Sequence, residues 1–141
     1  MSGVYQALTN LGRYAGREGQ WSFILHRLTG LGTLLFLTIH ILDTSTVYFF
    51  PELYEHAIEI YRLPLFMVGE IFLVFAVIFH GVNGLRIAVF DLFAPGGWAT
   101  NIQRHAALWT MAASLVLWLP AAFWMARSML IHSFGVTWLG G

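Results

Sequence analysis

Three long apolar stretches dominate the pattern of hydrophobic and polar positions along the chain. They run over residues 21–43, 64–91 and 104–131. Because about 20 apolar residues in a helix cross the hydrocarbon core of a bilayer, this pattern predicts three transmembrane helices. A more polar segment from Glu52 to Tyr61 predicts a short amphipathic helix on the outer side. The expected fold is therefore an all-α membrane protein.

The segments outside the three spans predict the orientation of the chain. Residues 1–20 form a polar, Gly-rich N-terminal arm, and residues 132–141 form an interfacial tail. Arginines flank the start of the first span and the turn at 91–104, whereas the first connection carries mainly glutamates. Since positive charge favours the cytoplasmic side, we expect a multi-pass protein of the plasma (inner) membrane. Its N-terminus would be cytoplasmic and its C-terminus outside.

Composition supports a lipid bilayer as the surroundings and excludes several kinds of site. Hydrophobic residues make up 58% of the 141 residues and charged residues 10%, with zero formal net charge, whereas soluble domains carry about 25% charged residues. Nothing in this charge balance indicates nucleic-acid binding. Because the chain has no cysteine, it offers no disulfide, no iron–sulfur ligand and no CxxCH site for covalent haem. Any haem here would be b-type.

Histidine and arginine interrupt the first two apolar stretches. They are His26, Arg27, His40, His80 and Arg86. A charged group near the bilayer centre costs about 2.5–3.5 kcal/mol on insertion scales, so such residues commonly mark a functional site. Histidine is also the commonest metal ligand in proteins. The pattern favours a non-covalently held haem, and a haem-free, proton-linked membrane protein is the alternative.

His80 begins the segment HGVNGLRIAVFD near the end of the second span. Gly84 lies one helical turn further along, beneath the same helix face, where a missing side chain leaves space for a flat macrocycle. Arg86 lies about 9 Å along the axis from His80, an offset that suits a cation meeting a haem propionate. The alternative is a histidine hydrogen-bonded between helices, with glycines that allow close helix packing.

The segment WSFILHRLTG at the cytoplasmic end of the first span suggests a second chemistry. His26 and Arg27 project about 100° apart on a helix, so one can reach a haem edge while the other faces a second cavity. A quinone site needs a hydrogen-bond donor to the carbonyl oxygen and a proton source. Ser22, His26 and Arg27 supply these groups. The alternative is that Arg27 reaches lipid phosphates and His26 is interfacial.

His40 lies on nearly the same helix face as His26, about 21 Å further along. This offset suits the ligand of a second haem near the outer side, with Asp43 as an acceptor that orients the imidazole. The alternative is a structural histidine that pairs with Asp43. We favour the structural role for His40, and therefore one haem over two.

The two segments SFILHRLTG and HGVNGLRIAVFD resemble the cytochrome b membrane-anchor subunit of succinate dehydrogenase (respiratory complex II). That family shows S-x-x-HR-x-[TS]-G and, further along the chain, H-x-x-x-G-[IL]-R-x-x-x-x-D, across three spans. The resemblance covers about residues 20–110 of the printed sequence. The GREGQW and HILDTS segments are similar to the anchors of actinobacterial or Thermus-type enzymes.

The resemblance implies a subunit of a succinate:quinone oxidoreductase that works in electron transport with haem b and a quinone, either menaquinone or ubiquinone. It implies that His80 is an axial ligand of the haem iron, with the opposite ligand from a second membrane-anchor subunit. His26 and Arg86 would contact the haem propionates. Arg27 and a nearby serine would line the quinone site beside the iron–sulfur subunit. Succinate oxidation would take place in the flavoprotein subunit and not in this chain.

One position departs from the family pattern. The family's serine stands four residues before the arginine, where this chain has Phe23, and Ser22 stands one position earlier. A shift of one residue turns a helical side chain by about 100°, which weakens the case for Ser22 as a quinone ligand but not that for Arg27. A b-type cytochrome subunit of another quinone-linked enzyme, such as a fumarate reductase or a hydrogenase, is a further alternative.

Overall fold

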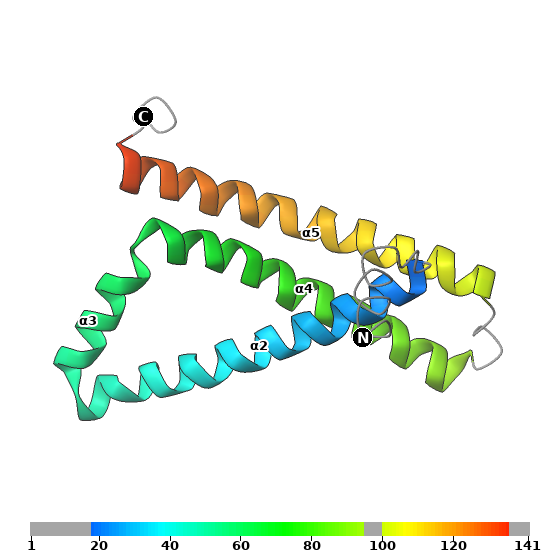
Figure 1. The fold of residues 1–141 in the computed structure, drawn as a ribbon, viewed down its shortest axis with the longest axis horizontal. Helices are drawn as coiled ribbons and strands as arrows, with labels where there is room; N and C mark the ends of the chain where they lie inside the picture. The colour runs from blue at the N-terminus through cyan, green and yellow to red at the C-terminus, as the bar shows by residue number, and fades with distance from the viewer. Residues whose placement is uncertain (1–17, 95–99, 136–141) are drawn as a thin grey trace, which may run out of the picture.

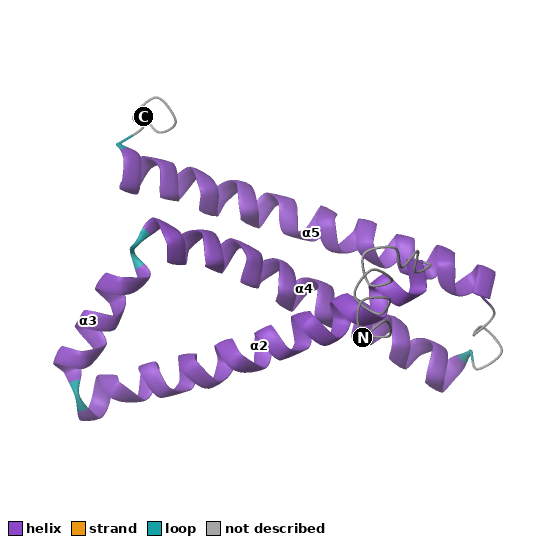
Figure 2. Ribbon diagram, in the orientation of Figure 1, coloured by secondary structure: helices purple, strands orange, loops and turns teal. Residues whose placement is uncertain are grey.

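The computed structural model describes residues 18–94 and 100–135, and these residues form helices with no strand (Figures 1 and 2). The prediction of an all-α membrane protein is confirmed. Residues 1–17, 95–99 and 136–141 lie outside the described part of the chain. Most of the predicted N-terminal arm, the middle of the second connection and most of the tail therefore lie outside it as well.

Four helices make up the described residues, and three of them are long and apolar enough to cross a membrane. Each of the three candidate spans has 30 residues, a length of about 45 Å against a hydrocarbon core of about 30 Å. Tilting or projection of the helix ends accommodates such an excess. The helices are α2 (Glu18–Phe49), α3 (Pro51–Tyr61), α4 (Pro64–Phe93) and α5 (Thr100–Phe134).

The first long helix continues beyond Asp43, where the apolar pattern ends. Thr44, Ser45 and Thr46 are polar, yet each hydroxyl donates a hydrogen bond to a backbone carbonyl three or four residues earlier. This bonding satisfies the hydroxyls within the helix, so α2 reaches Phe49 without a break. The end of an apolar stretch is therefore not the end of this helix.

Prolines begin the next two helices. Pro51 opens α3 and Pro64 opens α4, at a position where the missing N–H group of proline would have no helical partner. The helix α3 occupies the predicted amphipathic segment and connects the C-terminal end of α2 to the N-terminal end of α4. These three helices form the sides of a triangle in Figure 1.

The helix α4 lies between the other two spans: it runs beside α5 and crosses α2 near the start of α2 (Figure 1). Phe79 on α4 and Ser114 on α5 are fully buried. Trp118 of α5 donates from Nε1 to the carbonyl oxygen of Ile71 at 2.9 Å, and its ring meets Phe75 edge to face. Small residues and interhelical hydrogen bonds are the usual means of packing helices in lipid. They hold α4 and α5 together as the base for the site.

Candidate functional site

Two histidines from different helices stack face to face where α2 crosses α4. The ring centroids of His26 and His80 are 4.2 Å apart, and the ring planes differ by 2°. The Nδ1 atom of His80 lies 3.1 Å from the backbone carbonyl oxygen of His26. Since a carbonyl oxygen only accepts, Nδ1 carries the proton, and Nε2 is then the lone-pair nitrogen that can bind a metal. Within the described chain, Nε2 of His80 makes no hydrogen bond.

A glycine makes the close approach of His80 to α2 possible. A Cβ atom at Gly30 would lie 2.6 Å from Cε1 and 2.9 Å from Nδ1 of His80, so any side chain there would displace the imidazole. Gly30 is the last residue of the SFILHRLTG motif but was not among the predicted site residues. Its position one helical turn after His26 is the signal in the sequence that indicates it. Gly84, expected beneath His80, contacts instead the His26 ring, 3.6 Å from Cε1 to the position of a Cβ.

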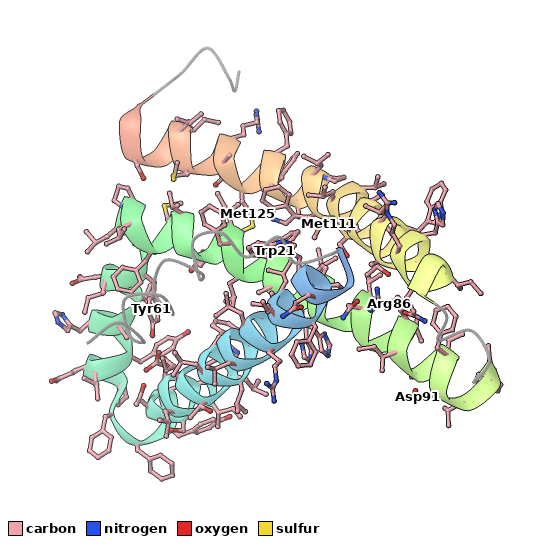
Figure 3. The ribbon with its side chains drawn as sticks, turned by 45° about the vertical axis from the view of Figure 1, so that its right-hand side comes forward. Trp21, Tyr61, Arg86, Asp91, Met111 and Met125 are labelled. Carbon is pink, nitrogen blue, oxygen red and sulfur yellow. The ribbon has the colours of Figure 1, made fainter. Side chains whose placement is uncertain are left out.

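Several buried nitrogen atoms near this crossing have no hydrogen-bond partner among the described residues. They are Nδ1 of His26, Nε and Nη1 of Arg86, and Nδ2 of Asn83. Arg86 lies on the stretch of α4 that runs beside the start of α5 (Figure 3). Buried donors without a partner are unfavourable, and a guanidinium is a donor of fixed positive charge. The site therefore suits a ligand that brings acceptor oxygens, above all carboxylates.

Ser22 and Phe23, adjacent at the start of α2, differ in exposure. Ser22 is buried and donates its hydroxyl proton to Oδ1 of Asn83 at 2.9 Å. Phe23 is exposed, and the guanidinium carbon of Arg27 lies 5.0 Å from the centre of its ring. This geometry commits the single hydroxyl proton of Ser22 to a helix–helix contact. Of the adjacent motif residues His26 and Arg27, Arg27 is the one whose side chain is exposed.

His40 lies apart from the His26–His80 pair, toward the α3 end of α2, and its ring packs on Phe36. It lines a cavity of about 650 Å³ between α2, α3 and α4, together with Asp43 and Glu70. Asp43 accepts a hydrogen bond from the hydroxyl of Tyr61 on α3 and not from His40 (Figure 3 labels Tyr61). That bond, with burial and the negative charge of Asp43, raises the pKa of the Tyr61 phenol above its usual range.

Comparison with known proteins agrees with the two motifs. The model of a family described as succinate dehydrogenase/fumarate reductase transmembrane subunit matches residues 6–121, a segment that includes His26, Arg27, His80 and Arg86. The chain is 32% identical over 120 residues to the succinate dehydrogenase 2 membrane subunit SdhC of Mycobacterium tuberculosis (strain ATCC 25618 / H37Rv). That match covers 84% of this chain and 85% of the relative. The resemblance is confirmed: the chain is an integral membrane protein that belongs to the succinate dehydrogenase/fumarate reductase transmembrane subunit family.

Proposed function

We propose that this chain is the membrane-anchor cytochrome b subunit of a succinate:quinone oxidoreductase. It holds haem b and forms the quinone-reduction site that receives electrons from the iron–sulfur subunit. The observation that carries the proposal is the His26–His80 pair, in which a hydrogen bond to Nδ1 leaves Nε2 of His80 as a ligand nitrogen. The similarity to a succinate dehydrogenase membrane subunit favours succinate dehydrogenase over the alternatives of fumarate reductase or hydrogenase.

The residues at the crossing fit haem b. His80 would bind the iron through Nε2, and a second membrane-anchor subunit would supply another ligand. Nδ1 of His26 and the buried nitrogens of Arg86, which have no partner among the described residues, would donate to the propionate carboxylates. Gly30 on α2 leaves room for the imidazole of His80 on α4, and Gly84 on α4 leaves room for the imidazole of His26 on α2. When bound, haem b supplies a one-electron carrier inside the membrane.

Arg27 is the residue of this chain that we assign to the quinone. Its side chain is exposed, and within the described residues it makes no hydrogen bond or ion pair. Its N–H groups are therefore free to donate to a quinone carbonyl oxygen, and its charge stabilises the negative charge that develops on that oxygen during reduction. Ser22, committed to Asn83, is not part of this assignment.

The assembly follows from the orientation expected for the spans. The start of α2, with Arg27, would lie at the cytoplasmic side, where the iron–sulfur and flavoprotein subunits would dock. With three spans, the C-terminus would then lie outside the plasma membrane. His40 would serve a second haem only if the cavity beside it were the outer haem site. The absence of a hydrogen bond between His40 and Asp43 among the described residues, where Asp43 bonds to Tyr61 instead, supports one haem, because the acceptor expected to orient His40 does not do so.

The test of the haem assignment is His80→Ala, measured by the reduced-minus-oxidised spectrum of the purified complex. The parent complex should show a b-type spectrum with one haem. The variant should lose or shift that spectrum, since alanine cannot replace the bond to iron. Succinate oxidation with a soluble electron acceptor should persist. His56→Ala, on the exposed face of α3, is the control; a normal haem spectrum in His80→Ala would contradict the assignment.

A further inference from the structure

Phe23 stands at the position where the family pattern has a serine, and its orientation is set by a buried hydrogen bond one residue earlier. Ser22 is 5% exposed and bonds to Asn83, which is fully buried, whereas Phe23 is 56% exposed. Rotating α2 to bring Ser22 outward would break this bond. The start of α2 is therefore held with an aromatic ring outward.

The outward ring of Phe23 lies one helical turn before Arg27. The guanidinium carbon is 5.0 Å from the ring centre, inside the distance of about 6 Å at which a cation is attracted to an aromatic face. Arg27 has no other partner among the described residues. The Phe23 ring is thus the contact that restricts where the flexible arginine side chain places its charge.

We propose that Phe23 is a positioning residue for the quinone site: it holds the guanidinium of Arg27 in the orientation that meets the quinone carbonyl. The inference rests on the proposed role of Arg27. A preset orientation matters because each freely rotating side chain that is ordered on binding lowers affinity and rate. It matters more in this chain, since no hydroxyl at the position of Phe23 adds a second donor. At this position the chain has a ring that orients the Arg27 donor, where the family pattern has a hydroxyl that can itself donate.

A ring that only faced lipid or a neighbouring subunit would behave differently. Its removal would change packing whether or not Arg27 was present. A ring that acts through the guanidinium loses its effect once the guanidinium is gone. The two roles therefore separate in a double-mutant cycle.

The experiment compares Phe23→Leu, Arg27→Leu and the double variant in the whole membrane complex. The readouts are kcat/KM for decylubiquinone or menadione with succinate as donor, haem content, and succinate oxidation with a soluble acceptor. Phe23→Leu should lower the quinone kcat/KM about three- to tenfold and leave the other two readouts unchanged. The same change in the Arg27→Leu background should have little further effect, and Phe23→Tyr, which keeps the ring, should retain the parent value. Phe72→Leu, at another exposed ring on α4, is the matched control.

Each other outcome contradicts the inference in a recognisable way. If Phe23→Leu lowers kcat/KM equally in both backgrounds, the ring acts independently of Arg27. If Arg27→Leu impairs quinone reduction and Phe23→Leu does not, Arg27 keeps its proposed role and Phe23 loses its own. If neither change alters quinone kinetics, the assignment of Arg27 itself is wrong and the inference fails with it.

Discussion

At the scale of single residues, the proposed chemistry depends on groups that have no hydrogen-bond partner among the described residues. The imidazole of His80 keeps Nε2 available because the His26 carbonyl takes the proton on Nδ1. The guanidinium of Arg27 keeps its N–H groups available because it packs on a ring, not on a carboxylate. In an apolar chain such groups are costly to place, which is why they are few.

The substitution Gly30→Ala tests whether His80 needs the space beside Gly30. In Gly30→Ala, the new Cβ would lie 2.6 Å from Cε1 of His80, so the imidazole must move and the stack with His26 must open. We expect reduced haem content or a shifted haem spectrum and redox potential. Gly32→Ala is the matched control, because a Cβ at Gly32 meets nothing within 4 Å. If both alanine variants matched the parent spectrum, the close contact would have no role in haem binding.

The substitution Arg27→Leu tests the assignment of Arg27 to the quinone site. Arg27→Leu keeps an apolar stem but removes the charge beside the carbonyl oxygen, and loss of one such group commonly lowers rates about 100-fold or more. Quinone reduction by the complex should fall steeply while the haem spectrum stays normal. Arg62→Leu, on the exposed surface where α3 ends, should leave quinone reduction unchanged. Equal kinetics in Arg27→Leu and the parent would assign Arg27 to the lipid interface.

At the scale of helices, polar side chains decide how the spans meet. The bond between Ser22 and Asn83 links α2 to α4, and the indole of Trp118 links α5 to α4. Each is a hydrogen bond in a region where water does not compete, worth about 1 kcal/mol in membrane proteins. These bonds fix the rotation of each helix, and with it the direction of the site residues.

The contact between α3 and α2 should depend on pH. The hydrogen bond from Tyr61 to Asp43 raises the pKa of the phenol above its ordinary value of 10.0. The protonated phenol is the form that the folded contact favours, so the contact is fully stabilised below about pH 10 and weakens as pH rises through the raised pKa. Because the chain has no cysteine, a single Ile58→Cys, on the side of α3 that lines the cavity beside α2, can report this change by its rate of thiol labelling.

Two comparisons make the pH measurement specific. Labelling of Ile58→Cys should accelerate above about pH 10, after correction for thiol ionisation with a model peptide. Adding Tyr61→Phe should give the faster labelling already at neutral pH and remove the alkaline step. A step of the same size with and without Tyr61→Phe would show that another group causes it.

At the scale of the whole molecule, the outward surface is overwhelmingly apolar. Large hydrophobic side chains are exposed along every described span, whereas few hydrophobic residues are fully buried. A surface of this kind is stable only against lipid or other apolar helices. The chain therefore reaches its working form as part of a membrane assembly, in which a second anchor subunit would also complete the haem site.

The topology of the assembly can be measured directly. With three spans, a cysteine added after Gly141 should react with a membrane-impermeant reagent applied to intact cells, and one placed at Ser2 should react only after the cells are opened. The arginine distribution is the physical reason. The opposite pattern of labelling would place the quinone residues of α2 at the outer side and contradict the proposed docking of the iron–sulfur subunit.

The apolar pattern alone predicted the fold class, the number of membrane spans and the ionisable residues that interrupt them. Lengths of apolar sequence translate directly into spanning helices because a bilayer leaves the backbone few other ways to satisfy its hydrogen bonds. The motifs likewise identified His26, Arg27, His80 and Arg86, since ionisable groups in such helices are rare. Helix ends were less predictable, because hydroxyl groups extend α2 past Asp43 by bonding to its own backbone.

Only the tertiary structure decided which of those residues meet, and how. Spacing along one helix cannot show that His26 stacks on His80, that Gly30 makes room for that ring, or that Gly84 lies beneath His26. These contacts join residues on different helices, so they depend on where α2 crosses α4 and on how each helix is rotated. Buried polar bonds such as Ser22–Asn83 set that rotation, and their partners lie too far apart in the sequence for any helical period to reveal.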